Sequence, residues 1–144
     1  MTTVNTYLYF NGNCKEAFDF YKSVFKKEFQ YIGRYKDVPE VARQNFPHCT
    51  DEQIMHIALP ISRETILMGA DIVEKQENDA ARYFSLYISA ESKKEADRLF
   101  SSLSNEGEIK LPISEQFWGS YYGICLDKFG INWKISFSVG STVA

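Results

Sequence analysis

Apolar and polar residues alternate strictly near the carboxyl-terminal end of the chain. From Ile131 to Phe137 every second residue is apolar, and the residues between them are polar. A period of two predicts a strand with one buried face and one face of different character. Residues 127–130 (DKFG) predict a tight turn just before this strand. We therefore expect helices to cover the apolar face, which leaves the polar face available for function.

The same patterns predict the remaining elements. Strands are expected at 4–10, 29–35, 54–61, 65–69, 83–89, 108–113 and 121–126. Helices are expected at 14–27 and 92–103, because each range carries a single apolar stripe at helical spacing. Segment 36–53 contains two prolines and mostly polar residues, which predicts a long loop of the kind that forms lids or stays disordered. The charged segment 70–81 is predicted to link two halves.

An internal repeat divides the chain. The tripeptide Lys-Glu-Ala occurs at 15–17 and again at 94–96, 79 positions later, and the strand–helix–strand–strand–strand order recurs with it. Self-similarity at a fixed offset indicates a duplicated structural unit. We predict a single domain, 1–144, built from two βαβββ modules at about 1–72 and about 82–140.

The repeat also predicts which strand faces are buried. The offset pairs Tyr7 with Leu86 and Tyr9 with Ile88, so we expect all four to face the helices. The faces away from the helices then carry a mixed and partly polar set of side chains. This set consists of Thr6, His56, Ser85, Tyr87, Asn132, Lys134 and Ser136. A mixed concave surface with an aromatic rim is typical of a small-molecule site.

Composition narrows the classes of function. The 144 residues include 11 Phe, 9 Tyr and 2 Trp, an aromatic content suited to a large core or a pocket for planar ligands. A net charge of −3 and the lack of a basic cluster argue against nucleic acid as a partner. No stretch approaches the roughly 18 apolar residues of a membrane span, and the amino terminus does not resemble a signal peptide. Three scattered cysteines predict reduced thiols in a cytoplasmic protein.

Several motifs together resemble the vicinal oxygen chelate superfamily (glyoxalase, bleomycin resistance and dioxygenase proteins), and more narrowly its PhnB-like branch. They are found at 7–17 (YLYFNGNCKEA), 20–21, 55–56, 67–71, 117–123 and 127–133. The resemblance implies an α+β, glyoxalase-like fold in which two tandem βαβββ modules form a half-open mixed β-barrel with the helices outside. It also implies a homodimer.

The resemblance to metal-binding members of the superfamily raises the question of whether this chain can bind a metal ion. They hold one divalent ion with His, Gln or Glu side chains from the first and last strands of each module. The matching positions here are Thr6, Met68, Ser85 and Lys134. A lysine ammonium has no lone pair to donate to a cation, and Thr, Ser and Met are poor ligands for these ions. We therefore expect neither a metal nor another cofactor.

Three functions remain open from the sequence. The protein binds a small organic molecule, such as an anionic one, without metal; or it is a metal-dependent lyase, isomerase or dioxygenase; or it sequesters a drug or metabolite without chemistry. Whether it is an enzyme is left open. The branch is often labelled demethylubiquinone methyltransferase-like, but no glycine-rich nucleotide fingerprint supports a methyl-donor site.

Several individual residues have two alternative roles that the sequence leaves open. His56 is either hydrogen-bonded to a neighbour or in contact with a ligand. Lys134 is either a solvated strand lysine or a cation for an anionic ligand. Trp118 and Tyr121 belong either to the core or to the rim of the site. The full set of ligand-site candidates is Thr6, His56, Met68, Ser85, Tyr87, Trp118, Tyr121, Asn132 and Lys134.

Overall fold

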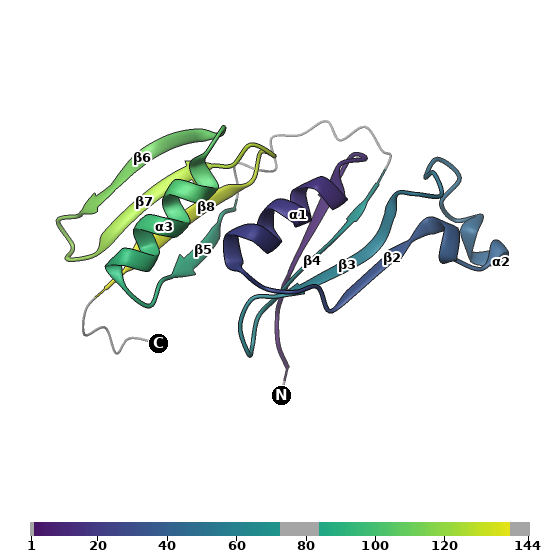
Figure 1. Ribbon diagram of the computed structural model, residues 1–144, viewed down its shortest axis with the longest axis horizontal. Coiled ribbons are helices and arrows are strands. Elements are labelled where there is room, and N and C mark those ends of the chain that lie inside the picture. Colours follow the sequence, from purple (N-terminus) through teal and green to yellow (C-terminus); the bar gives the residue numbers. More distant parts are fainter. Residues whose placement is uncertain (1, 73–83, 139–144) are drawn as a thin grey trace. The chain divides into compact units, whose positions relative to one another are not determined.

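The computed structural model describes residues 2–72 and 84–138, which fall into two compact units, 1–76 and 77–144 (Figure 1). In unit 1 the elements follow the chain as β1 (Thr6–Phe10), α1 (Cys14–Phe25), β2 (Tyr31–Arg34), the 3-10 turn η1 (Tyr35–Asp37), α2 (Glu40–Arg43), β3 (Ile54–Pro60) and β4 (Ile66–Asp71). The sheet order is β1-β4-β3-β2, with β1 parallel to β4 and the other pairs antiparallel.

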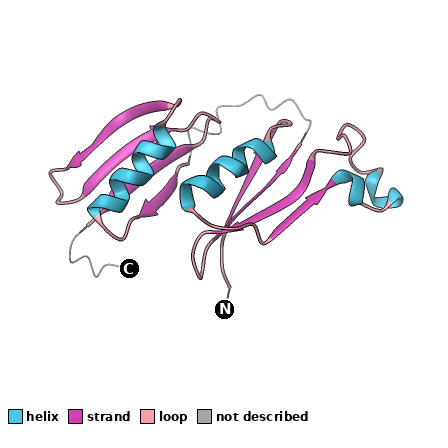
Figure 2. Ribbon diagram, viewed as in Figure 1, coloured by secondary structure: helices cyan, strands magenta, loops and turns pink. Residues whose placement is uncertain are grey.

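Unit 2 repeats this arrangement. Its elements are β5 (Leu86–Ser89), α3 (Lys93–Ser104), β6 (Glu108–Glu115), β7 (Tyr121–Leu126) and β8 (Asn132–Phe137). The sheet order is β5-β8-β7-β6, and only the β5–β8 pair is parallel. One long helix lies against each four-stranded sheet (Figure 2). The α+β class and the two βαβββ modules are thus confirmed.

Each long helix buries the apolar stripe that the sequence predicts. Ala17 and Tyr21 on α1, and Ala96 and Leu103 on α3, are all buried. A glycine in each sheet lets a helix phenylalanine approach closely: a Cβ on Gly69 would lie 2.7 Å from the ring of Phe18, and one on Gly123 would lie 2.9 Å from Phe100. The described helices include none that is long and apolar enough to cross a membrane.

A buried carboxylate joins three segments of unit 1. Asp71, at the end of β4, is 1% exposed, and its Oδ1 accepts hydrogen bonds from the backbone N–H groups of Gly12 and Cys14. Its Oδ2 accepts the N–H of Ile54, at the start of β3. Asn13 stands at the N-cap position of α1 but makes no capping side-chain bond. The helix start is therefore stabilised by a residue distant in sequence.

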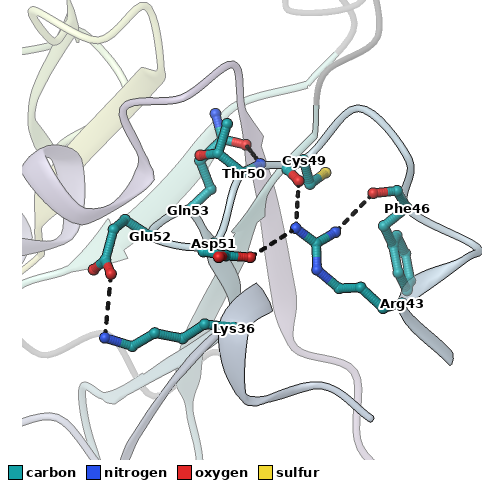
Figure 3. A network of polar contacts seen from close by, with 8 residues as sticks. All are labelled: Lys36, Arg43, Phe46, Cys49, Thr50, Asp51, Glu52 and Gln53. Carbon is teal, nitrogen blue, oxygen red and sulfur yellow. Dashed lines mark hydrogen bonds and ion pairs between the residues drawn. The ribbon is translucent and has the colours of Figure 1, made fainter. Parts of the chain in front are cut away.

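The segment 36–53 contains two short helical turns, whereas the sequence predicted a long loop of the kind that forms lids or stays disordered. The guanidinium of Arg43 donates to the carbonyl oxygens of Phe46 at 2.8 Å and Cys49 at 2.5 Å, and to the Asp51 carboxylate at 3.3 Å (Figure 3). It also lies over the ring of Tyr35, with its central carbon 5.3 Å from the ring centroid. We call these contacts the Arg43 clasp. The clasp gives the Cys49 carbonyl a partner and adds a second donor to the Phe46 carbonyl, which already accepts the N–H of Cys49.

The structure corrects the buried face of β1. Leu8 and Phe10 are 3% and 6% exposed and face α1, so Tyr7 and Tyr9 lie on the opposite side of the sheet. The offset of 79 holds for the helices, where Ala17 matches Ala96. Between β1 and β5, the first strands of the two modules, the offset is one residue shorter. One additional residue between β5 and α3 thus reverses the predicted faces, because a strand has a side-chain period of two.

Two further predictions differ from the structure or extend beyond it. Strand β4 continues through Ala70 and Asp71, which the sequence analysis placed in the link between the halves. The rest of that link, up to 81, and the predicted strand start at 83 lie outside the described residues. In unit 2 the predicted faces hold, with Trp133 and Ile135 buried.

Candidate functional site

In each unit the sheet has one face away from its helix, which we call the open face. One row of residues crosses all four strands on the open face of unit 1. It runs Tyr7, Met68, Ala58 and Tyr31, as the strand register shows. His56 lies beside this row on β3 and contacts the rings of both Tyr7 and Tyr31.

Four aromatic side chains gather there, and we call them the Tyr7 cluster. They are Tyr7, Tyr9, Tyr31 and His56. The ring of His56 is stacked on Tyr7 at 5.6 Å between centroids and lies 5.7 Å from Tyr31. Tyr9 is 56% exposed and Tyr31 49%. The cluster therefore offers exposed ring surface rather than filling a core.

A hydrogen bond of 3.0 Å joins the Tyr7 hydroxyl to His56 Nδ1. Burial raises the pKa of the Tyr7 phenol, and the nearby Tyr9 and Cys14 groups raise it further. Tyr7 is thus a neutral phenol at neutral pH. When it donates to Nδ1, the ring proton of His56 stands on Nε2. In that state Nε2 can donate to an acceptor above the sheet.

A small residue makes room for this arrangement. Gly33 of β2 pairs with His56, and a Cβ placed on it would lie 2.6 Å from the hydroxyl oxygen of Tyr31. The Tyr31 ring therefore lies across Gly33, toward the histidine. The contact of Tyr31 with Gly33 is local, because the two residues are two positions apart on β2, whereas the approach of Tyr31 to His56 follows from the strand pairing.

The open face of unit 2 has a different character. Lys134 lies on β8 between Tyr87 of β5 and Ile124 of β7. The Tyr87 hydroxyl is 2.7 Å from the Oγ of Ser136, a serine that is only 4% exposed. Tyr87 itself is 61% exposed. This face combines a cation with hydroxyl groups and aromatic rings.

The predicted site residues divide between the two open faces. His56 and Met68 lie on that of unit 1, and Tyr87, Asn132 and Lys134 on that of unit 2. Ser85 precedes β5 and is half-buried. Trp118, 52% exposed, lies at the turn before β7 and contacts the ring of Tyr122.

Two of the candidate residues lie on the helix-facing sides of their sheets. Thr6 shares the helix-facing side of β1 with Leu8. Tyr121 donates a hydrogen bond to Asp97 of α3, so it also faces its helix. The alternation of β1 allows either phase, and the repeat offset selected the wrong one.

The prediction missed Tyr7, Tyr9 and Tyr31. A chemical signal could have identified the first two. A buried tyrosine must find a partner for its hydroxyl, whereas Leu8 and Phe10 have no polar atom to satisfy. That difference favours the leucine and phenylalanine as the core residues of β1.

The residues present do not fit the divalent ion of the metal-binding relatives. Thr6 is on the helix side of its sheet, and the Lys134 ammonium has no lone pair and repels a cation. Met68 offers only a soft thioether. Across residues 2–72 and 84–138 no group of three His, Cys, Asp or Glu side chains is placed to hold a metal.

Comparison with solved structures identifies the class of fold. The fold is similar to that of the glyoxylase/bleomycin resistance protein/dioxygenase domain from Frankia sp. EAN1pec, with a TM-score of 0.68 and 12% identity, covering 98% of this chain and 94% of that one. This is a protein of the glyoxalase-like fold. A family model described as 3-demethylubiquinone-9 3-methyltransferase matches residues 2–136, so the chain belongs to that family.

Relatives agree with this placement in the PhnB-like branch. The chain is 28% identical over 141 residues to Protein YjdN of Escherichia coli (strain K12), covering 92% of this chain and 93% of that protein. The structure of protein PA1353 from Pseudomonas aeruginosa is similar at a TM-score of 0.77 and 29% identity, covering 96% and 98% of the two chains. The PhnB protein from Bacillus cereus is similar at a TM-score of 0.78 and 25% identity, covering 95% and 100%.

Proposed function

We propose that the protein binds a small planar organic molecule on the open face of unit 1, without a metal ion. The observation that carries this proposal is the Tyr7 cluster, in which exposed aromatic rings surround one hydrogen-bonded histidine. Rings of this kind bind planar molecules by stacking and edge contacts. His56 Nε2 adds one directed donor, so the best ligand has an acceptor such as a carbonyl oxygen beside its ring.

Methyl transfer, the activity in the name of the family model, is less well supported. The turn after β1 (Asn11-Gly12-Asn13) leads into a helix, as a nucleotide-binding turn would. Its amide groups at Gly12 and Cys14 are, however, already bound to the Asp71 carboxylate. A phosphate or carboxylate of a nucleotide cofactor would have to displace a buried negative charge.

Binding of an uncharged planar ketone tests the proposal. With 4-fluoroacetophenone as the probe, fluorine NMR should detect binding, and the amide signals of residues 7, 9, 31 and 56 should shift. Tyr9→Ala should weaken binding about tenfold, because stacking contributes about 0.5–1.5 kcal/mol beyond burial. Tyr7→Phe should also weaken binding, because it removes the partner that orients His56.

The control substitution lies one residue away on the opposite face. Thr6→Val should leave the dissociation constant within about twofold of the original value, since surface changes away from a site have small effects. Equal losses in Thr6→Val and Tyr9→Ala would contradict the assignment to this face. So would a probe that shifts no amide signal of the cluster.

Metal content tests the second half of the proposal. Purified protein should contain no stoichiometric zinc, nickel, manganese or iron, and a chelator should leave its melting temperature unchanged. Lys134→Glu should confer only weak affinity for divalent ions, because the positions of Thr6, Met68 and Ser85 supply no strong ligand. Near-stoichiometric metal bound through His56 would overturn the metal-free proposal and favour an enzyme of the superfamily.

A further inference from the structure

The open face of unit 2 carries a lysine with no acidic residue among its direct neighbours in the described part of the sheet. On its face of the sheet Lys134 has Tyr87 and Ile124 as cross-strand neighbours, and Asn132 and Ser136 along its own strand. The ammonium has no hydrogen bond or ion pair with another residue in the described part of the chain. Lys134 is half-buried, so its charge lacks both full hydration and a counter-ion.

Two hydroxyl groups lie next to this charge. Ser136 is two residues along β8 from Lys134, a rise of about 6–7 Å, and its Oγ is 2.7 Å from the Tyr87 hydroxyl. One of these hydroxyls donates to the other, which leaves one O–H of the pair free to donate elsewhere. Ser136 is buried and Tyr87 is exposed, so the outward O–H belongs to Tyr87 when Ser136 donates to it.

Two aromatic side chains border the same surface. Tyr122 of β7 pairs with Ser136, and the ring of Trp118 stands 5.4 Å from the ring of Tyr122 in an edge-on arrangement. Trp118 is half-exposed, with 52% of its surface accessible. A ligand held at Lys134 can therefore place a flat apolar body beside these rings.

We infer that the open face of unit 2 binds the carboxylate of a planar organic acid, with Lys134 supplying the charge and the Tyr87–Ser136 pair a hydrogen bond. A single ammonium balances a single negative charge, which favours a carboxylate over a phosphate dianion. An ammonium at this position favours an anionic ligand and repels a cation. The site lies wholly in unit 2 and does not depend on the proposed function of unit 1.

The experiment uses the full chain and 4-fluorobenzoate as the probe. Fluorine NMR titration should show binding, and amide signals of residues 87, 122, 134 and 136 should shift. Uncharged 4-fluorobenzyl alcohol should bind at least about tenfold more weakly than the acid, because it lacks the charge that a lysine recognises. Added salt should weaken binding of the acid more than that of the alcohol.

Variants separate the charge of Lys134 from general effects. Lys134→Gln should weaken benzoate binding about tenfold or more, and Tyr87→Phe by a smaller factor. Lys134→Arg keeps the charge and should retain binding within about threefold, which controls for folding. Lys110→Gln removes the same charge from an exposed position on β6 and should leave the affinity unchanged.

Several outcomes would overturn the inference. They are equal affinity of Lys134→Gln and the original protein, equal loss in Lys110→Gln, or inorganic phosphate displacing the probe at lower concentration than benzoate itself. Shifts confined to residues 7, 9, 31 and 56 would also overturn it, although they would agree with the proposed function of unit 1. Conversely, Tyr9→Ala should leave benzoate binding unchanged, so failure of either proposal leaves the other testable.

Discussion

Asp71 shows how much a single buried side chain can organise. Its two carboxylate oxygens accept three backbone N–H groups, from the turn before α1, the first residue of α1 and the start of β3. Its own carbonyl accepts the Tyr35 hydroxyl at 2.8 Å. Asp127 has a similar structural role in unit 2. Its carboxylate accepts hydrogen bonds from the N–H groups of Phe129 and Ile131 and from the indole N–H of Trp133. Both carboxylates thus join a strand end to a distant element or a turn.

Asp71→Asn tests this role at the residue scale. The amide keeps the size of the side chain but replaces one acceptor oxygen with a donor, which opposes a buried N–H group. We expect a loss of about 2–4 kcal/mol in the free energy of unfolding, measured in urea. The matched control is Asp19→Asn, an exposed partner of Lys15 on α1, which should cost less than about 1 kcal/mol. Similar losses in both variants would contradict the buried role.

Tyr121 permits a second test, by pH. Its hydroxyl donates to the Asp97 carboxylate, and this bond, with some burial and the charges of Asp97 and Glu115, raises the pKa of Tyr121 to about 12. The raised pKa means that the neutral phenol is favoured in the folded state. Its contribution to stability is therefore complete below about pH 10 and is lost as the pH rises toward 12.

Absorbance at 295 nm measures this titration. Tyr121→Phe should remove a phenol that titrates near pH 12, and Asp97→Asn should shift that group back toward the ordinary range near pH 10. If Tyr121→Phe instead removes a phenol that titrates near pH 10, the contact with Asp97 does not form in solution.

At the scale of elements, the segment between β2 and β3 depends on the Arg43 clasp. Lys36 reaches Glu52 at 3.2 Å, and Thr50 donates its N–H to the Gln53 side chain (Figure 3). Arg34 also reaches Glu52, at 3.7 Å. These ion pairs are exposed and therefore weak. Arg43, by contrast, donates hydrogen bonds to two backbone carbonyls and lies over an aromatic ring. We therefore expect Arg43 to hold the segment in place more strongly than the exposed ion pairs do.

Arg43→Gln should loosen this segment without unfolding the unit. Hydrogen exchange of the amides between 36 and 53 should become faster, and proteases should cleave there first. The global free energy of unfolding should fall by no more than about 1 kcal/mol, because the sheet and α1 are untouched. Lys36→Gln, which removes only an exposed ion pair, is the control and should leave the exchange rates nearly unchanged. Equal acceleration in the two variants would show that Arg43 has no special role.

At the scale of the whole molecule, both sheets are open, with strands β1 and β2 at the edges of one and β5 and β6 at the edges of the other. Unpaired edges present backbone donors and acceptors to any second chain. We expect the protein to pair as a symmetric homodimer. Sedimentation at tens of micromolar should give about twice the chain mass of 16.6 kDa, and a single species at the chain mass would contradict the expectation.

The sequence by itself determined the elements and their duplication. Periods of two and of 3.6 residues locate the strands and the two long helices, because each pattern reflects which local conformation can bury one apolar side. Unit 2 was also assigned its faces correctly, since Trp133 and Ile135 alternate with clearly polar residues. From Tyr7 to Phe10 the residues on both faces of β1 are apolar or aromatic, so alternation alone could not choose between the faces.

The tertiary structure decided what the open faces contain. The Tyr7 hydroxyl meets His56 from 49 positions away, and the Tyr31 ring reaches His56 because β2 pairs with β3 in one register. Asp71 accepts the first N–H group of α1 from 57 positions away. Contacts of this kind depend on strand pairing and sheet order, which set the positions of distant residues in space and leave no periodic trace along the chain.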